Sequence, residues 1–383
     1  MEKLRVGLLF GGRSVEHDVS IVSARSILGA LDQSRYEVLL LAVDPRGRWH
    51  VANADTALDD VQQEGCVFLP AEPGATTLVA AGDDDDDEES TSNVESFGDG
   101  AQLDVIFPII HGRGGEDGAL QGLLELAEVP YVGSGVLSSA VQMDKDIAKR
   151  LLSAAGLPVT PWIAFSGIEL DQGGLPAAAE RAEAEIGFPV FVKPANSGSS
   201  IGIARAESIP ELVAALADAQ RYDRKVIVEA SVDAREIEVA VLGNDEPEAS
   251  IPGEIRATQA FYDYDAKYLD EATELIIPAK LDADQTEAIR TTAIQAYQTL
   301  EAEGMARVDF LLDRETGQFF VNELNSLPGF TSGSMYPKLW EATGRSYPAL
   351  LDRLIELALE RHDRRTKLET HPPAMLSADK DHE

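Results

Sequence analysis

The sequence has very little cysteine. Cys66 is the single cysteine among 383 residues. One thiol cannot form an intramolecular disulfide, and a four-cysteine zinc site is excluded. A reducing compartment is the simplest setting for such a chain, so we expect a cytoplasmic protein. No histidine-bearing motif accompanies Cys66, so a role as catalytic nucleophile is not favoured.

Long apolar runs are also absent. No run approaches the roughly 20 residues that a membrane-spanning helix needs. The apolar run at residues 6–10 ends at two glycines and is shorter than the apolar core of a secretory signal. Hydrophobic residues still make up 44% of the chain, enough to bury proper cores. We therefore expect no membrane insertion, and two or three domains, because domains usually have about 100 to 150 residues.

Basic residues are scarce. The chain has 32 Lys and Arg against 67 Asp and Glu, a formal charge of -35, and ten of the basic residues are lysine. Nucleic acid and anionic membranes need a basic footprint, so neither is an expected partner. Residues 83–89 hold seven acids in a run that is typical of a solvated insertion near 83–96 without function. The other 28 net charges are dispersed, which suggests a halophilic source, where salt screens self-repulsion.

Alternating strand and helix patterns predict an α/β and α+β protein with three regions. Residues 1–135 indicate an α/β layer with a Rossmann-like parallel sheet. Residues 136–225 and 226–362 indicate two further α+β regions, and the polar tail at 363–383 is expected to fray. Residues 50–100 are interpreted as a hairpin and a solvated loop. Predicted strands cover residues 4–10, 38–43, 103–110, 189–193, 201–205, 226–229, 236–242, 306–312 and 318–324, and predicted helices cover 20–31, 119–127, 144–155, 176–186, 209–219, 284–302 and 345–361.

The predicted helix after Asp144 has a clear start and stop. Asp144 can cap its first turn, and Gly156 can end it. Ile147, Leu151 and Ala155 share one face at a spacing of four, the pattern of an amphipathic helix.

The predicted hairpin at 306–325 gathers oxygen ligands. With a five-residue connection at 313–317, Leu312 pairs with Gln318, Arg307 with Glu323 and Asp309 with Val321. Because side chains alternate along a strand, Arg307, Asp309, Glu323 and Asn325 then project to one face. Three oxygen donors beside a guanidinium suit a divalent cation held against phosphate. An exposed polar face with surface ion pairs has the same pattern. A one-residue slip in register would place the side chains of the two strands on opposite faces, and the predicted cation site would be lost.

The segment VKPANSGSSIG at 192–202 is rich in glycine and serine. Small residues let backbone N–H groups approach phosphate oxygens, and Lys193 can reach the same space. This is not a Walker A loop, since the sequence contains no Gly-Lys pair. A plain flexible hairpin tip remains the alternative for this segment alone.

Two loops follow strands of the first predicted sheet, where ligands bind in open α/β sheets. In GGRSVEHDVS at 11–20, Glu16 could hold an ammonium group, although an acid at a helix start is also unremarkable. His111 ends another strand of the same sheet. The other histidines have no partner pattern and are interpreted as structural or surface residues.

Two later segments complete the candidate site. NSLPGFTSGSMYPK at 325–338 follows the acidic strand, and Ser334 lies near a predicted helix start, where N–H groups suit a carboxylate or oxyanion. The polar, aromatic segment at 261–271 is typical of a mobile loop that closes over a site, or of a plain surface loop. Two lysines, Lys145 and Lys193, an acidic face and anion-binding glycines in one chain fit phosphoryl transfer from a nucleotide.

Six runs now show a family resemblance. Residues 4 to about 360 resemble D-alanine–D-alanine ligases, and six motifs in the right order are highly specific. The matching runs are GGRSVEHDVS, HGRGGEDGALQGLLELAEVPYVGSG, Met143-Asp144-Lys145, VKPANSGSSIG, DAKYLDE and ARVDF with VNELNSLPGFTSGSM. The resemblance implies a three-domain ATP-grasp fold with ATP held between the central and C-terminal domains.

The resemblance also implies roles at the nucleotide. Lys145 and Lys193 match phosphate-binding lysines, and residues 199–201 (Ser199, Ser200 and Ile201) match the loop that covers the phosphates. Glu229 and Glu236 match contacts to the adenine amino group and the ribose, and Lys267 matches a further ATP-binding residue. Asp309, Glu323 and Asn325 resemble the ligands of two Mg²⁺ ions, for which Mn²⁺ can substitute.

At the amino acids, the resemblance implies that Glu16 holds the ammonium of the first D-alanine and is hydrogen-bonded to Ser199 and Tyr268, with His111 nearby. Arg307 and the Gly329 N–H match the oxyanion donors. Ser334 and the Met335 N–H match the groups that receive the second carboxylate. The family usually carries leucine where Met335 stands, with little effect expected on a backbone contact.

The implied reaction joins two D-alanine molecules through an acyl phosphate at the cost of ATP, for peptidoglycan precursor synthesis, and a homodimer is the expected assembly. The base that deprotonates the second ammonium is not evident from the sequence. A ligase joining D-alanine to D-lactate is the nearest alternative, against which Tyr268 argues, because such relatives tend to lack the Lys-Tyr pair. Another ATP-grasp carboxylate–amine ligase and a non-catalytic nucleotide-binding or scaffold protein are the remaining alternatives.

Overall fold

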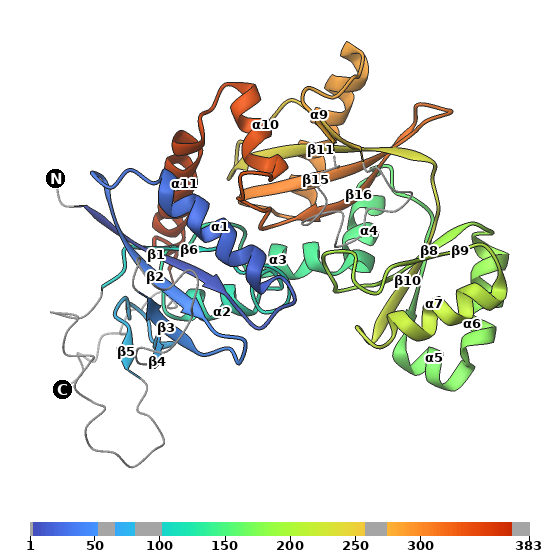
Figure 1. Ribbon diagram of the computed structural model, residues 1–383, viewed down its shortest axis with the longest axis horizontal. Helices are drawn as coiled ribbons and strands as arrows, with labels where there is room; N and C mark the ends of the chain where they lie inside the picture. Colours follow the sequence, from blue (N-terminus) through green and yellow to red (C-terminus); the bar gives the residue numbers. More distant parts are fainter. Residues whose placement is uncertain (1–2, 53–65, 81–101, 257–273, 370–383) are drawn as a thin grey trace, which may run out of the picture.

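The computed structural model describes residues 3–52, 66–80, 102–256 and 274–369. These residues form three sheets, and the first and second lie towards opposite ends of the molecule in Figure 1. Three predicted features lie outside the described residues: the acidic insertion near 83–96, the loop at 261–271 with Lys267 and Tyr268, and the end of the polar tail. No helix among the described residues is both long and apolar enough to cross a membrane.

The first sheet has the strand order β5-β4-β3-β2-β1-β6. Its strands and flanking helices are β1 (Leu4–Gly11), α1 (His17–Ala30), β2 (Tyr36–Val43), β3 (Trp49–Ala52), β4 (Cys66–Phe68), β5 (Val79–Ala80), β6 (Val105–Pro108) and α2 (Ala119–Leu126). β1 pairs in parallel with β2 and β6, as the α/β pattern predicts. The predicted hairpin within 50–100 is present as β3 to β5, which pair antiparallel, so the sheet is mixed rather than wholly parallel.

The second sheet is small, with the order β7-β10-β8-β9. Its elements are β7 (Trp162–Ser166), α5 (Gly167–Gly173), α6 (Leu175–Glu185), β8 (Val190–Pro194), β9 (Ala204–Ala206), α7 (Ile209–Ala219) and β10 (Lys225–Ala230). β10 pairs with β7 and β8, although its residues fall largely in the third region predicted from the sequence. The strand predicted at 201–205 starts later, because residues 201 and 202 form a turn.

The third sheet has the order β14-β13-β11-β15-β16, with β12 beside β11. The remaining elements are α3 (Val136–Met143), α4 (Lys145–Ala154), β11 (Ala234–Gly243), β12 (Glu248–Ala249), β13 (Gly253–Arg256), β14 (Glu274–Ile276), α9 (Ala283–Thr299), β15 (Gly304–Asp313), β16 (Phe319–Asn325), α10 (Met335–Thr343) and α11 (Tyr347–Thr366). The sequence did not predict α3, α5, β7, β13 or β14, most of which are short.

The apolar face predicted for the α4 helix is wrong. Ile147 and Leu151 are exposed, at 36% and 40%, and Ala155 is exposed as well. The buried face instead carries Ala148, Leu152 and the charged Lys149. Asp144 does cap the helix, accepting from the Ile147 N–H at 3.1 Å. Ala148 and Leu152 pack into the core beside the third sheet, and Lys149 pairs with buried Glu229, so contacts distant in sequence decide which face is buried.

The register predicted for the hairpin is also wrong, but the four side chains that it placed on one face do share a face. Leu312 pairs with Phe319 rather than Gln318, a one-residue slip that would reverse every side chain. A β-bulge that leaves Asn322 unpaired then adds a second one-residue shift, which restores the alternation of faces, and Asp309 lies opposite Glu323 and Arg307 opposite Asn325. All four side chains therefore share one face after all.

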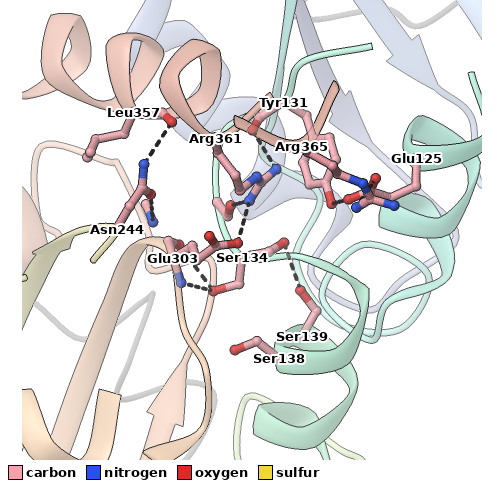
Figure 2. A network of polar contacts seen from close by, with 12 residues as sticks. Glu125, Tyr131, Ser134, Ser138, Ser139, Asn244, Glu303, Leu357, Arg361 and Arg365 are labelled. Carbon is pink, nitrogen blue, oxygen red and sulfur yellow. Dashed lines mark hydrogen bonds and ion pairs between the residues drawn. The ribbon is translucent and has the colours of Figure 1, made fainter. Parts of the chain in front are cut away.

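A buried arginine joins the first and third sheets. Arg361 of α11 donates to the carbonyl oxygens of Gly133 and Tyr131, the second at 3.0 Å, and its guanidinium lies 4.1 Å from the Tyr131 ring centroid. Ser134 extends the network to Glu303 before β15, as Figure 2 shows. The C-terminal helix thus fixes the first sheet beside the third.

Candidate active site

A cavity of about 1440 Å³ opens where the three sheets meet. β8 and β10 of the second sheet, strands β11, β15 and β16 of the third sheet, and the loops after β1 and β6 all contribute to it. The predicted site residues that line it are Glu16, His111, Lys145, Lys193, Ser199, Ser200, Glu229, Glu236, Arg307, Asp309, Glu323, Asn325, Gly329, Ser334 and Met335. The structure therefore brings together residues that lie more than 300 positions apart in the chain.

The acidic face of the hairpin forms the floor of the cavity. Arg307 donates to both carboxylate oxygens of Asp309 at 2.7 Å and lies 3.1 Å from Glu238. The Asn325 amide lies 2.9 Å from Asp309. Burial disfavours the charge on Arg307, but Asp309 and Glu238 outweigh it and raise its pKa above the ordinary value. The guanidinium is thus a fixed positive charge at the floor.

Lys145 connects the acidic face to the Gly/Ser loop. Its ammonium lies 3.2 Å from Glu323 and donates to the Ser197 carbonyl at 2.8 Å. Its own N–H donates to the Ala195 carbonyl, which ties the start of α4 to the loop. One flexible cation therefore reaches both places where phosphate oxygens are expected.

Lys193 lies deeper, in a buried pair of lysines around one carboxylate. Glu229 accepts from Lys193 and lies 3.1 Å from Lys149, which also donates to Thr160 at 2.9 Å. Burial opposes ionisation of Glu229, but the two lysines lower its pKa to about 2. Burial lowers the pKa of Lys149, while Glu229 opposes that change. Glu229 is therefore an anion with a fixed orientation.

The Gly/Ser loop crosses the cavity in an uncommon backbone conformation. Ser199 and Ser200 have φ values of 48° and 57°, in the left-handed region that residues other than glycine seldom adopt. The Ser199 hydroxyl donates to the Glu16 carboxylate, as the resemblance implied. Ile201 does not line the cavity; its N–H closes a turn onto the Gly198 carbonyl at 3.2 Å.

Glu16 is enclosed by loops from both sides. A methyl group at Gly112, whose φ is +78°, would come within 2.8 Å of its carboxylate. His111 lies beside it and contacts the Leu327 carbonyl through Nδ1 at 3.1 Å. Because a carbonyl only accepts, Nδ1 carries the proton, and Nε2 faces the Ser23 hydroxyl at 3.5 Å. Burial lowers the pKa of His111, so the ring is neutral.

The opposite end of the cavity has an anion-binding character. Ser334 is the N-cap of α10, and Met335 is its first residue. The Ser334 hydroxyl accepts from the Thr331 N–H at 2.9 Å, and a methyl group at Gly329 would come within 2.8 Å of that hydroxyl. The positive end of a helix with close backbone N–H groups suits a carboxylate.

The sequence analysis did not single out three polar residues at the cavity. Glu116 and Glu238 line it, and Lys149 holds Glu229 from behind. Glu116 lies five residues after His111 in the same strand-end loop, so that position was a usable signal. Lys149 lies one helical turn after Lys145, but nothing in the pattern shows that it is buried.

Two lysines and a loop of small residues lie above an acidic face, between two mainly antiparallel sheets. This is the arrangement of an ATP-grasp ligase. Glu16 and His111 line another part of the same cavity. Family models described as "D-ala D-ala ligase N-terminus" and "D-ala D-ala ligase C-terminus" match residues 5–134 and 151–356. The chain belongs to the D-alanine–D-alanine ligase family.

Individual relatives agree over nearly the whole chain. D-alanine–D-alanine ligase A of Escherichia coli strain K12 is 47% identical over 97% of this chain and 100% of its own length. The solved D-alanine–D-alanine ligase from Coxiella burnetii superposes with a TM-score of 0.81 at 35% identity, covering 96% of this chain and 97% of that one. VanG D-Ala:D-Ser ligase from Enterococcus faecalis gives 0.80 at 31% identity, with 93% and 100% covered.

Proposed function

We propose that this protein joins two molecules of D-alanine, with hydrolysis of ATP to ADP and phosphate, to give D-alanyl-D-alanine for peptidoglycan. The observation that carries the proposal is the convergence of Lys145, Lys193, the hairpin face and Glu16 on one cavity. The amino-acid pocket around Glu16 directly adjoins the phosphate-binding elements, through the hydrogen bond from Ser199. A carboxylate bound there would meet the terminal phosphate.

In the first step, the carboxylate of the first D-alanine attacks the γ-phosphate of ATP and forms an acyl phosphate. Glu16 holds its ammonium, and His111 packs beside it. Lys145 and Lys193 neutralise charge on the phosphates, and residues 199–201 cover them. Glu229 and Glu236 bind the adenine amino group and the ribose, and Lys267 adds a further contact to ATP.

In the second step, the amine of the second D-alanine attacks the acyl carbon and phosphate leaves. Ser334 and the Met335 N–H hold its carboxylate at the start of α10. Arg307 and the Gly329 N–H stabilise the oxyanion, an interaction whose loss typically costs about 2.7 to 4 kcal/mol. The resemblance assigns Tyr268 a hydrogen bond to Glu16, through which it would complete the pocket and exclude water from the acyl phosphate.

The residues present fit the two Mg²⁺ ions, or Mn²⁺ in their place, that the family implies. Asp309 and Glu323 lie opposite each other in the ladder, and the Asn325 amide contacts Asp309. Two carboxylates and an amide are hard oxygen donors that leave ligand positions for phosphate oxygens. When bound, the metal would neutralise charge on the transferring phosphoryl group.

Three further proposals rest on the sequence and the resemblance. We infer a cytoplasmic location from the single cysteine and a homodimer from the family resemblance. We also propose domain limits at 1–135, 136–225, 226–362 and 363–383.

Phosphate release measured with ATP, Mg²⁺ and D-alanine tests the proposal. We expect release that depends on D-alanine and yields D-alanyl-D-alanine by mass spectrometry. Parallel reactions with D-lactate or D-serine as the second substrate should give much less mixed product. No phosphate release with D-alanine would refute the function, and preferential depsipeptide formation would support the D-lactate alternative.

A further inference from the structure

The carboxylate of Glu116 has no role in the mechanism so far. Glu116, in the loop between β6 and α2, lines the cavity and is partly exposed to it. The Gly112 N–H donates to its carboxylate at 2.5 Å, and the Leu327 N–H also donates to it. The carboxylate is therefore positioned where the loop after β6 meets the loop that leads to Gly329 and Ser334.

Glu116 and Glu16 lie on two sides of the same glycine. The Gly112 N–H reaches the Glu116 carboxylate, and a methyl group at Gly112 would come within 2.8 Å of the Glu16 carboxylate. Burial and then the nearby charge of Glu16 raise the pKa of Glu116 to about 8, while Lys145 opposes this. Neutral His111 is the other titratable group of this loop that faces the pair. Glu116 thus exchanges a proton near neutral pH.

Several other groups in the cavity are poorly suited to accept a proton. Glu229, Glu238, Asp309 and Glu323 each lie against a lysine or arginine, which favours their unprotonated forms. His111 uses both ring nitrogens, one towards Leu327 and one towards Ser23. Glu16 accepts a hydrogen bond from the Ser199 hydroxyl, and it is already assigned to the ammonium group of the first amino acid.

We propose that Glu116 is the general base that takes a proton from the ammonium of the second amino acid. The inference rests on the proposed function. The carboxylate accepts one proton from the –NH₃⁺ group, and the freed lone pair attacks the acyl carbon. The new C–N bond forms while the carbonyl π electrons move to oxygen as the oxyanion, and their return breaks the C–O bond to phosphate, which leaves with the electron pair of that bond. The remaining excess proton passes from nitrogen to the departing phosphate.

The test compares two acceptors in Glu116→Gln and the wild type. D-alanine must lose a proton before it attacks, whereas hydroxylamine is already neutral at pH 7 and traps the acyl phosphate as a hydroxamate. In Glu116→Gln we expect dipeptide formation to fall by about 10²-fold or more, the usual contribution of a general base. Hydroxamate formation should stay within about threefold of wild type. Glutamine can still accept from the Gly112 N–H, so the loop is expected to keep its shape.

Asp117→Asn is the matched control, because Asp117 accepts from the Gly114 and Ala119 N–H groups in the same loop. It should change both rates by the same small factor. Equal losses of dipeptide and hydroxamate in Glu116→Gln would overturn the proposal, as would an unchanged dipeptide rate. A wild type that forms no hydroxamate would instead refute the proposed function, on which this one rests.

Discussion

The Ser199 hydroxyl donates a hydrogen bond to the Glu16 carboxylate across 183 positions of sequence. It joins the Gly/Ser loop of the second sheet to the loop after β1 in the first. Ser199 and Ser200 hold positive φ values, a conformation that costs on the order of 1–3 kcal/mol per residue. Contacts such as that with Glu16 offset this cost, so the Gly/Ser loop is positioned by the loop after β1.

Removing that hydroxyl should weaken use of D-alanine. In Ser199→Ala, Glu16 loses a charge-assisted hydrogen bond worth about 1.5–3 kcal/mol. We expect kcat/KM for D-alanine to fall by about 10- to 100-fold. Steady-state phosphate release checks this. Ser153→Ala, at an exposed position on α4, should match wild type, and a normal kcat/KM in Ser199→Ala would remove the hydrogen bond from the mechanism.

Glu323 should be essential for phosphoryl transfer. Glu323→Gln removes one of the two carboxylates that face each other in the hairpin and leaves Lys145 without an anionic partner at 3.2 Å. Turnover should fall by a factor on the order of 10² or more, while the circular dichroism spectrum stays unchanged. Glu315→Gln, in the exposed connection of the same hairpin, should keep full activity. Near wild-type turnover in Glu323→Gln would refute its metal role.

Arg361 should matter for stability although it is remote from the chemistry. Arg361→Met would leave the carbonyls of Tyr131 and Gly133 without their donor and Glu303 without its cation, at a cost of about 3 kcal/mol. Thermal or urea unfolding measures this. Arg364→Met removes an exposed pair on the same helix and should cost less than about 1 kcal/mol. Equal effects in both variants would contradict a special role for the buried arginine.

The charge of -35 predicts a strong response to salt. Raising KCl from 0.1 M to 1 M shortens the screening length from about 10 Å to about 3 Å and weakens repulsion between carboxylates. We expect the melting temperature and activity to rise over this range. Deleting residues 83–89 removes seven charges and should preserve most of the response, because the remaining 28 are dispersed. A maximum near 0.1 M would count against a halophilic source.

The sequence by itself determined the local chemistry. Alternation along two short strands placed Arg307, Asp309, Glu323 and Asn325 on one face, and turn and capping signals located the loops. These features depend on neighbours a few residues apart, which a pattern records. The predicted hairpin register was off by one residue near the turn and by two residues at Arg307 and Asp309, and only the bulge at Asn322 returned the four side chains to one face.

Only the tertiary structure decided which charges are buried and which groups meet. Lys149 looks like a solvent-facing lysine in the sequence, yet it lies at 2% exposure because Glu229 of β10 and Thr160, just before β7, contact it. Ile147 and Leu151 are exposed because they lie on the other face of the same helix. The raised pKa of Glu116 comes from burial and from Glu16, one hundred positions earlier in the chain. Desolvation and the proximity of charges depend on distances in three dimensions. Residue spacing along the chain does not give those distances.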